Sequence, residues 1–553
     1  MKFEVLLPRF IIYEDEHLLV VNKPAGLNTH APSPYATFGI YDYLRHFKPE
    51  WKDLAIIHRL DKETSGILIF SKSKLANKSL TEQFTERQVS KKYILITRGK
   101  PKQNQFSVRS HIMRFGAQFK SVPLKPGLEP AETYFKVPEK SDDELINLCL
   151  DWINYAKDFH KHDELTVLIA EPFTGRTHQV RLHAADNGCA VLGDTICGGG
   201  TSIRLWLHSA EISFVHPATG RQITFRAKPL AASPAFALRN ELLNDQTDSY
   251  RLVHGISDDL DGIYVDKYGK WLLVQSARDL MADESETIKI LARECNTVGA
   301  YHKFLQKEVR AFEPSVLKPK PLFGEIAPEN FVITENGVKY LVSFEEGYSV
   351  GIFLDQRDNR RRILTRYIGA NFPFPDESRQ MEVLNTFSYT CAFSVVAALA
   401  GMKTVSIDLS EKYLNRGRKN FELNGLNPDD HEFIKGDVFD WLKRFGKKQR
   451  TFDFIILDPP TFSQSKTSGA FNAWKDYPDM LNPALKILKP DGLILACLNT
   501  ASVAPERFVE MVNSSVAKSG RKISKSFFVT QSMDFPSSTE LPAYLKCLWL
   551  QIR

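Results

Sequence analysis

The chain has 553 residues, of which 43% are hydrophobic, 25% charged and 11% aromatic. This length is too great for one ordinary hydrophobic core, and the composition excludes collagen-like, disordered and coiled-coil proteins. Residues 1–240 carry 32 Lys and Arg against 25 Asp and Glu, whereas the rest of the chain carries 40 against 41. The excess of positive charge in the first part is a weak indication of a polyanionic partner.

The cysteines and the apolar stretches bear on the cellular compartment. The seven cysteines are scattered and form no C-x-x-C pair, which favours reduced thiols over a disulfide framework or a zinc ribbon. No stretch approaches the twenty apolar residues of a membrane span, and residues 1–8 lack the apolar region of a signal peptide. We therefore expect a cytoplasmic protein with no membrane partner.

Residues 1–232 are predicted to form a first domain in which short strands and helices follow one another in mixed order. Strands are expected at 11–13, 18–22, 67–70, 93–97 and 165–170. Successive short strands indicate an α+β fold with a mixed or antiparallel sheet. Residues 227–234 contain two prolines and three alanines, and we expect 233–247 to be a linker.

The remaining chain is predicted to contain two further domains. Residues 248–350 are β-rich and small. Residues 351–553 alternate strands, at 383–387, 405–408, 433–435, 454–457 and 493–496, with helices such as 411–424 and 476–488. This alternation is typical of a doubly wound, Rossmann-like parallel sheet, whose ligand site lies at the carboxyl ends of the strands. The whole chain is thus expected to be a multidomain α/β protein.

Three polar motifs in the first domain stand in a fixed order. HRLDKETSG at 58–66 precedes a strand, KKY at 91–93 opens another, and TGRTHQVRLH at 174–183 follows a third. A polar loop before a strand is usually just a turn. Together, however, the three motifs resemble the RluA-type RNA pseudouridine synthases, as do PAETYFKV at 130–137 and HPATG at 216–220. The resemblance covers about residues 10–230.

The resemblance implies a catalytic role for Asp61, a place for Tyr93 against the target uracil, and an ion pair between Arg176 and the aspartate. Isomerisation of uridine breaks a glycosidic bond and rejoins the base through carbon 5, so an ionised carboxylate is needed near the anomeric carbon. Attack on the sugar and proton abstraction both remain open for this carboxylate. Many relatives carry an amino-terminal S4 RNA-binding module, whereas here Met1 almost adjoins the catalytic domain, so other parts of the chain are expected to bind the RNA.

A metal site is the alternative interpretation of the same region. His178, His183, Cys189, Cys197 and His208 are potential ligands, but their spacing fits no zinc pattern. We therefore expect no metal.

Polar groups also follow the strands of the predicted parallel sheet. Residues 385–390 (NTFSYT) end the first strand and open a helix, Asp408 ends the second, Asp437 follows the third, and Asp458 follows the fourth. A single acid in such a place is commonly a helix cap, but four successive strand ends indicate a ligand site with ribose-binding chemistry.

These residues resemble the class I S-adenosylmethionine-dependent methyltransferases, and more narrowly the RlmI/RlmK-type enzymes of the large ribosomal subunit. The matching strings are GIFLDQR at 351–357, FSYT at 387–390 and LDPPTFSQSK at 457–466, and residues 251–275 look like the RlmI central domain. By this resemblance S-adenosylmethionine is the cofactor, Asp408 holds its ribose, Asp437 lies by the adenine, and Asp458 with Pro459 faces the target base. The other implied cofactor contacts are Asn385, Phe387, Tyr389 and Thr390.

The sequence departs from the methyltransferase pattern at Cys391, where the family usually has glycine. A cysteine is expected to take ordinary helical angles there. The methylated atom also depends on a cysteine, because methylation of cytosine carbon 5 needs a thiolate. Alignment on Gly492 places Asn499, as in RlmK-type relatives, where RlmI-type enzymes have that cysteine, which favours guanine. Cys497 lies two residues earlier and keeps 5-methylcytidine open.

The sequence as a whole predicts a bifunctional enzyme that makes pseudouridine and methylates a base, with large-subunit (23S) rRNA as the expected substrate. An RNA-binding ribosome-assembly factor with one inactive site is the alternative of a different class, and Asp61 and Asp458 argue against it. A methyltransferase for proteins or small molecules is a further alternative, which the synthase motifs disfavour.

Overall fold

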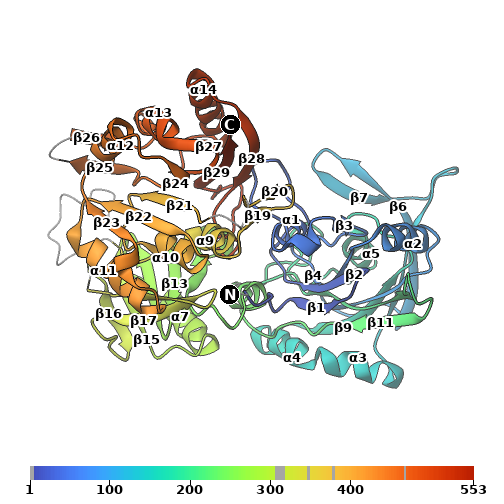
Figure 1. The fold of residues 1–553 in the computed structure, drawn as a ribbon. Coiled ribbons are helices and arrows are strands. Elements are labelled where there is room, and N and C mark those ends of the chain that lie inside the picture. Colours follow the sequence, from blue (N-terminus) through green and yellow to red (C-terminus); the bar gives the residue numbers. More distant parts are fainter. Residues whose placement is uncertain (1–4, 306–317, 346–348, 376–379, 466–468) are drawn as a thin grey trace.

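The computed structural model describes residues 5–305, 318–345, 349–375, 380–465 and 469–553. Figure 1 shows two large parts side by side, the first in blue to green and the second in green to red. The first corresponds to the predicted synthase domain, and the second contains the central and carboxy-terminal regions.

The first part is built on an 11-stranded sheet. Its central path runs β1-β2-β4-β10-β5-β9-β8-β6-β7, with β3 on β4 and β11 on β10. Among the described strands of this sheet, β4 and β10 pair in parallel and the other pairs are antiparallel. The predicted mixed sheet is confirmed. The strands are β1 (Ile11–Glu14), β2 (Leu18–Lys23), β3 (Ala55–Ile56), β4 (Ser65–Ser71), β5 (Ser90–Arg98), β6 (Gln105–Phe115), β7 (Gln118–Val122), β8 (Ala131–Lys136), β9 (Leu165–Pro172), β10 (Leu207–Val215) and β11 (Gln222–Arg226).

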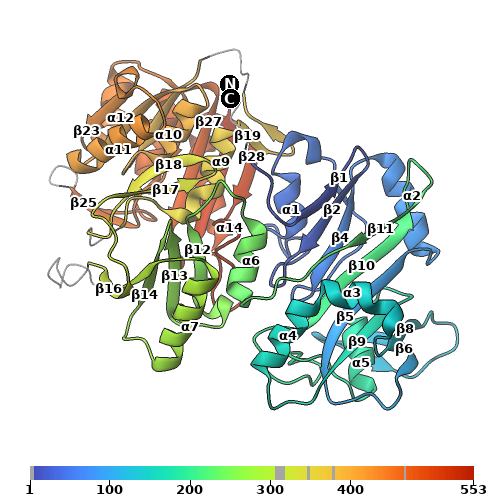
Figure 2. The ribbon, with the colours of Figure 1, turned by 90° about the horizontal axis from the view of Figure 1, so that it is seen from below.

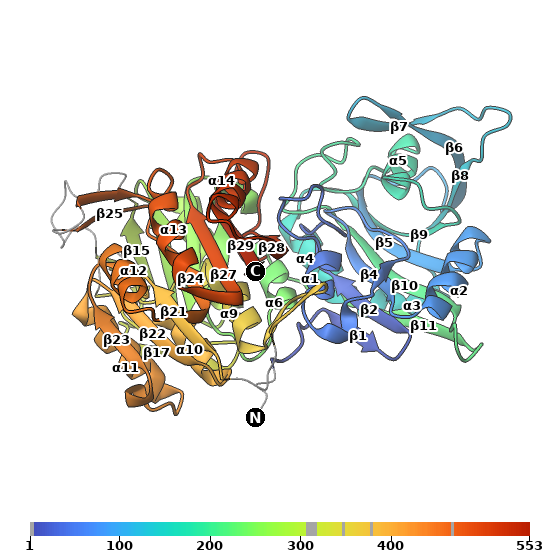
Figure 3. The same cartoon turned by 45° about the horizontal axis from the view of Figure 1, so that its top comes forward.

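Helices cover this sheet, and its strand β4 is buried throughout. All seven residues of β4 are buried, because α2 packs on one face and the region around α1 on the other. Figure 3 shows the β6–β7 hairpin extending away from the body of the domain, beside α5. The helices are α1 (Ile40–Arg45), α2 (Lys74–Thr85), α3 (Asp143–Leu148), α4 (Leu150–Phe159) and α5 (Gln179–Asp186).

The segment 233–247, expected to be a linker, is instead built around a helix. Helix α6 (Pro234–Leu242) buries Leu238 and Leu242 in one hydrophobic core that also contains Phe10 of the first domain and Leu252 and Val265 of the central region. Figure 2 shows α6 between these two parts. The first domain and the central region therefore share a core, and burial of apolar area holds them together.

The central region contains a five-stranded sheet in the order β12-β13-β14-β15-β16 and a separate hairpin, β17-β18. One face of the sheet packs on α6 and α7, and the other packs against the carboxy-terminal domain. The β-rich character predicted for 248–350 is what the structure has. The elements are β12 (Tyr250–His254), β13 (Ile263–Tyr268), β14 (Trp271–Ser276), α7 (Ala282–Glu294), β15 (Gly299–Phe304), β16 (Lys320–Gly324), β17 (Phe331–Glu335) and β18 (Val338–Val342).

The carboxy-terminal sheet has seven strands in the order β23-β22-β21-β24-β27-β29-β28. The first five are parallel and β29 is antiparallel to both of its neighbours, so the sheet is mostly parallel rather than wholly so. Its strands are β21 (Glu382–Thr386), β22 (Lys403–Asp408), β23 (Glu432–Lys435), β24 (Phe452–Leu457), β27 (Leu488–Asn499), β28 (Ile523–Val529) and β29 (Leu545–Ile552). Two short ribbons accompany it, β19 (Tyr367–Gly369) with β20 (Phe372–Pro373), and β25 (Phe462–Ser465) with β26 (Gly469–Asn472).

Helices lie on both faces of this sheet because successive strand residues point to opposite sides. Val383 contributes to the core shared with α9, α10 and α11, whereas its neighbour Leu384 contributes to the core under α12, α13 and α14. The helices are α9 (Arg357–Leu364), α10 (Ala392–Leu399), α11 (Glu411–Leu423), α12 (Val438–Lys447), α13 (Tyr477–Ile487) and α14 (Pro505–Lys518). The carboxyl ends of the parallel strands thus meet at one edge, as expected for the ligand site.

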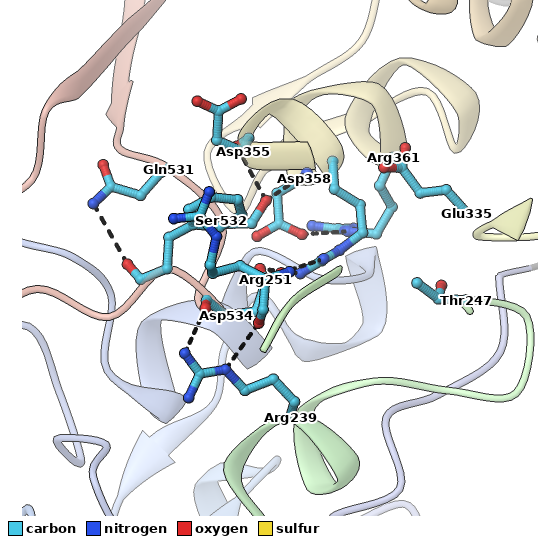
Figure 4. A network of polar contacts seen from close by, with 12 residues as sticks. Arg239, Thr247, Arg251, Glu335, Asp355, Asp358, Arg361, Gln531, Ser532 and Asp534 are labelled. Atoms are coloured by element: carbon cyan, nitrogen blue, oxygen red, sulfur yellow. Dashed lines mark hydrogen bonds and ion pairs between the residues drawn. The ribbon is translucent and has the colours of Figure 1, made fainter. Parts of the chain in front are cut away.

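A network of buried charges joins the parts (Figure 4). Asp534 accepts two hydrogen bonds from the Arg357 guanidinium, at 2.5 and 2.8 Å, and one from the backbone amide of Arg251. Arg239 of α6 donates to the carbonyl oxygen of Asp534 and pairs with Asp258 through both terminal nitrogens. The network fixes how the carboxy-terminal domain sits on the central region.

The arginine-rich helix α9 also reaches the first domain. Arg361 donates to the backbone carbonyl of Phe47 at 2.9 Å and lies 4.6 Å from the centre of its ring. His46 accepts from the amide of Ala370, and its ring lies 4.5 Å from that of Phe527. The synthase part and the methyltransferase part are therefore in direct contact.

Candidate functional sites

The predicted catalytic carboxylate lies in a large cavity of the first domain. Asp61 sits in the turn before β4 and lines a cavity of about 820 Å³. The turn is held by Lys23, whose buried ammonium group donates to the carbonyls of Pro24, Leu27 and Lys62. Burial lowers the pKa of Lys23 to about 7. A cavity of this size is in the usual range for a small-molecule site.

Gly66 allows the turn to lie against the neighbouring strand. Its φ is +120°, and a Cβ atom there would lie 2.3 Å from the carbonyl oxygen of Ser209 on β10. Any larger residue would push β4 away from β10 and displace the preceding turn. The glycine therefore fixes where Asp61 points.

The arginine beside Asp61 is Arg181, and the predicted ion pair with Arg176 is wrong. The Arg181 Nη1 atom lies 3.4 Å from Asp61, and the same guanidinium pairs with buried Asp194 at 2.6 and 2.8 Å. Arg176 instead pairs with Glu129, and 48% of its side chain is exposed. Asp194 accepts hydrogen bonds from the backbone amides of residues 196 and 197, so Arg181 is held rigidly against Asp61.

Two further groups complete the wall around Asp61. The ring of Tyr93 on β5 lines the cavity, and burial raises its pKa to about 12, so it is a neutral aromatic surface. The Nε2 atom of His178 lies 3.9 Å from Asp61, and Phe119 of the β6–β7 hairpin contacts its ring. Burial lowers the pKa of His178. Sequence reasoning placed Tyr93 here, named His178 only as a possible metal ligand and as part of the TGRTHQVRLH motif, and did not single out Arg181 or Asp194.

The potential metal ligands of this region have other partners. The His183 ring forms hydrogen bonds with the hydroxyls of Ser110 and Thr133. The His208 ring forms hydrogen bonds with the Ser65 hydroxyl and the carbonyl of Ala227. Across the described ranges, no three His, Cys, Asp or Glu side chains are grouped so that they could hold a metal ion.

The second site lies at the carboxyl edge of the parallel sheet. Asp408, at the end of β22, accepts the amide of Tyr389 through one oxygen and the amide of Ser410 through the other. Burial raises the pKa of this carboxyl. Each carboxylate oxygen can accept a second hydrogen bond, so Asp408 ties the turn after β21 to the start of α11 and can still accept from a ligand.

The turn after β21 has an unusual backbone. Phe387, Tyr389 and Cys391 all have left-handed angles, with φ of 51°, 48° and 62°. The expectation that Cys391 takes ordinary helical angles is therefore wrong. A Cβ atom on Gly417 of α11 would lie 2.5 Å from the Cys391 Sγ. Because Gly417 has no side chain, the cysteine has room in this position. Non-glycine residues in this conformation cost about 1–2 kcal/mol each, and such strain is found mostly at functional sites.

Not every predicted cofactor contact faces the site. Asn385 donates to Ser394, and the Thr390 hydroxyl donates to the carbonyl of Gly351 at 2.6 Å. Both side chains are buried, so they shape the turn rather than line the site. Phe387 is half-buried, and its ring stacks on that of Phe471 with centroids 5.9 Å apart.

The strand ends fit the chemistry of a nucleoside cofactor. Asp437 caps α12 by accepting two backbone amides through one oxygen, while its other oxygen has no hydrogen bond among the described residues. Leu409, which follows Asp408, is 46% exposed. The Asp408 carboxylate can accept hydrogen bonds from ribose hydroxyls, and the Asp437 carboxylate can accept from the exocyclic amine of an adenine. The exposed Leu409 side chain can pack on the face of the purine. The residues therefore fit S-adenosylmethionine.

Asp458 occupies the end of β24 and is joined to the segment before α9. It accepts from the Gln356 side-chain amide at 3.1 Å. Burial, together with nearby Asp355, raises the pKa of Asp458 to about 7. Pro459 is buried directly after it. Neither Asp355 nor Gln356 was singled out from the sequence, although both lie in the quoted GIFLDQR string.

The seven cysteines, all of which the structure describes, offer little accessible thiol. Six are buried, and Cys197 of the synthase domain is partly exposed. Cys497 on β27 lies opposite Cys547 of β29, and its exposed fraction is 0%. Burial raises the pKa of the Cys497 thiol well above its ordinary value. Asn499, two residues on, is exposed, and its carbonyl accepts from the hydroxyl of Thr461.

Comparison with known proteins assigns both halves. Residues 17–186 match the family model of RNA pseudouridylate synthases, and residues 278–542 match that of S-adenosylmethionine-dependent methyltransferases. A ribosomal RNA large subunit methyltransferase I from Aeromonas salmonicida is 34% identical over 307 residues, which are 55% of this chain and 74% of that relative.

Two solved structures are similar to parts of the chain. The crystal structure of SMU.776 complexed with SAH is 31% identical, with a TM-score of 0.48, and the match covers 56% of this chain and 76% of that chain. Human RNA Pseudouridylate Synthase Domain Containing 1 is 21% identical, with a TM-score of 0.31, and covers 42% of this chain and 90% of its own.

The folds, the sites and these matches define the class: a pseudouridine synthase domain joined to an S-adenosylmethionine-dependent methyltransferase domain. Both resemblances predicted from the sequence are confirmed. Through its methyltransferase half, the chain belongs to the family of ribosomal RNA large subunit methyltransferase I. Among the described residues, no helix has the length and apolar character needed to cross a membrane.

Proposed function

We propose that this protein modifies large-subunit ribosomal RNA twice, converting a uridine to pseudouridine and methylating a guanine. The name of the Aeromonas salmonicida relative supports ribosomal RNA as the substrate. The excess of positive charge in residues 1–240 agrees with a polyanionic partner.

In the synthase site, Asp61 supplies the carboxylate at the anomeric carbon. The Arg181 guanidinium, whose Nη1 atom lies 3.4 Å from Asp61, holds this carboxylate in position. Tyr93 offers an aromatic face to a uridine that has left its stack, and the cavity gives that base space to turn.

In the methyltransferase site, bound S-adenosylmethionine supplies an electrophilic methyl group. Asp408 and Asp437 hold the nucleoside part, and Asp458 with Gln356 faces the acceptor base. Guanine nitrogen 7 has an available lone pair and attacks without losing a proton. Cytosine carbon 5 requires prior addition of a thiolate.

The observation that favours guanine is the burial of the thiols. Every cysteine of the methyltransferase domain, namely Cys391, Cys497 and Cys547, is fully buried. A nucleophilic cysteine is normally partly exposed and has a lowered pKa, whereas burial raises the pKa of Cys497. Cys497 is thus best explained as a core residue.

The test uses RNA containing 5-fluorocytidine, which traps an enzyme that adds a thiolate to cytosine. We expect no covalent adduct, a methylated guanosine after digestion, and near-normal methylation by Cys497→Ala. Cys295→Ala, in the central region, is the matched control for loss of a buried thiol. A trapped adduct that disappears in Cys497→Ala would establish 5-methylcytidine instead.

A further inference from the structure

A second cavity, of about 160 Å³, lies between the central region and the methyltransferase domain. Strands β12 to β15 form one wall, and the segment 349–355 forms another. Residues that line it include Tyr268, Gln275, Lys303, Phe353, Asp355 and Tyr544. Nothing in the predicted catalytic set explains it.

The cavity adjoins both parts of the methyltransferase site. The Tyr389 hydroxyl donates to the carbonyl of Ser349 at 3.3 Å, and the rings of Tyr389 and Phe353 lie 5.4 Å apart. On the other side of the cavity lies Asp355. Its neighbour in the chain, Gln356, donates a hydrogen bond to Asp458. A group held in this cavity would therefore lie beside the cofactor turn and the acceptor-facing acid.

Aromatic side chains give the cavity flat walls. Tyr268 and Phe535 are almost fully buried, whereas Phe353 is 45% exposed. An exposed phenylalanine next to a polar cavity is an unusual placement in a water-facing loop, and a flat ring of this kind can stack on an unpaired base.

The polar groups of the cavity present a defined pattern. Asp355 accepts the Tyr544 hydroxyl at 2.9 Å through Oδ2, while its Oδ1 has no hydrogen bond within the described parts of the chain. Gln275 donates to Asp266, which also pairs with Arg251. Lys303 of β15 belongs to the same lining and brings a basic side chain with three N–H donors. One carboxylate oxygen of Asp355 and one basic residue thus line the same cavity.

This pattern matches guanine better than the other bases. Along its Watson–Crick edge guanine has two neighbouring donors, N1–H and the 2-amino group, followed by the O6 acceptor. A carboxylate takes such donors and an ammonium takes O6. Cytosine has one donor and two acceptors on this edge, so it offers the carboxylate fewer hydrogen-bond donors than guanine does. With this edge bound, nitrogen 7 on the neighbouring Hoogsteen edge is left open.

We propose that the cavity between the central sheet and the methyltransferase domain receives the flipped-out guanine, with Asp355 reading its N1–H and 2-amino groups and Lys303 its O6. The inference rests on the proposed function and names the residues that select the base. It also gives the central region a role, because the region supplies one wall of the base pocket.

The experiment compares RNA carrying guanosine or inosine at the mapped methylation site, since inosine lacks the 2-amino group. For the wild type we expect kcat/KM to fall at least fivefold with inosine. For Asp355→Asn we expect kcat/KM with guanosine RNA to fall at least tenfold and inosine to cause little further loss. S-adenosylmethionine binding, measured by calorimetry, is expected to stay within twofold and reports that the variant is folded.

The lysine provides a second, independent variant. Lys303→Met is expected to lower kcat/KM at least fivefold, whereas Lys320→Met, an exposed lysine on β16 of the same sheet, is expected to leave it unchanged. Equal inosine effects in wild type and Asp355→Asn, with methylated guanosine as product, would overturn the base pocket and leave the proposed function intact. Methylated cytidine as the product would overturn the proposed function itself.

Discussion

At the scale of single residues, two arginines near the synthase cavity have very different surroundings. Arg181 is buried and held by Asp194, while Arg176 is half-exposed and pairs with Glu129. The buried guanidinium has a fixed distance to Asp61, and the exposed one is screened by solvent. The structure therefore places Arg181, and not Arg176, beside the proposed catalytic carboxylate of Asp61.

We expect Arg181→Lys to lower the kcat of pseudouridine formation by about 30-fold, roughly 2 kcal/mol, because lysine keeps the charge for Asp194 but loses the guanidinium fork that also reaches Asp61. Arg176→Lys is the matched control and is expected to change KM for RNA by less than threefold. Single-turnover assays check both. A larger loss of kcat in Arg176→Lys would restore the assignment made from the sequence.

Asp458 makes stability depend on pH. Its folded pKa of about 7 lies above its ordinary value, so the folded state binds the proton more tightly than the unfolded state. The stability due to this group is present at low pH and is lost as pH rises towards 7. Asp458→Asn should be more stable than the wild type by about 1–3 kcal/mol at pH 8.5 and by less at pH 5.5. Thermal midpoints at the two pH values check this, and an advantage that grows at low pH would contradict it.

The motifs predicted that Asp61 and Tyr93 lie together, as they do in one cavity, but they could not rank two arginines five positions apart. His178 has left-handed angles at the start of α5, and this reversal of the chain lies between Arg176, which pairs with Glu129, and Arg181, which reaches Asp61. Nothing in the composition of the motif predicts that reversal. The partner Asp194 is also distant in sequence, so the pairing became visible in the fold.

At the scale of elements, strands were easier to predict than their surroundings. The five parallel strands and helix α11 lie within a few residues of their predicted bounds, because apolar runs bounded by acids and turns are strong local signals. Helix α6 was read as a linker, since prolines and alanines in 227–234 give no periodic pattern. Its apolar residues are buried only because the central sheet packs on them, and a local pattern cannot predict that contact.

The turn after β21 and helix α11 form a complementary pair, which gives a double-mutant test. Gly417→Ala would place a Cβ 2.5 Å from the Cys391 sulfur, so we expect S-adenosylmethionine affinity to fall at least tenfold, about 1.4 kcal/mol. Cys391→Gly in the same chain removes the clash and should restore most of the affinity. Calorimetry on the four variants checks the cycle. Additive losses would show that the two positions are not coupled.

At the scale of the whole molecule, the synthase and methyltransferase parts behave as one body. One core runs from the first domain through α6 into the central sheet, and a second runs from that sheet into the methyltransferase domain. Arg361 adds a direct contact from α9 to the first domain. We therefore expect the two active sites to keep a fixed relative orientation on the RNA.

Removal of the charge on Asp534 tests this connection. Asp534→Asn leaves Arg357 without its buried partner, which costs about 3–5 kcal/mol. We expect calorimetry to record one unfolding transition in the wild type and a lower, divided transition in the variant. Asp491→Asn removes an exposed pair with Arg553 and should change stability by less than about 1 kcal/mol. Two separate transitions in the wild type would contradict the single body.

The central claim is that one chain carries two separate activities on RNA. The direct measurement is mapping of both products on unmodified large-subunit rRNA incubated with the protein, using chemical labelling for pseudouridine and mass spectrometry for methylation. We expect both products from the wild type with S-adenosylmethionine, pseudouridine alone without it, and methylation alone from Asp61→Asn, whose pseudouridine rate should fall by at least about three decades, or ~4 kcal/mol. Absence of both products from the wild type, with RNA still bound, would contradict the account and favour a ribosome-assembly factor.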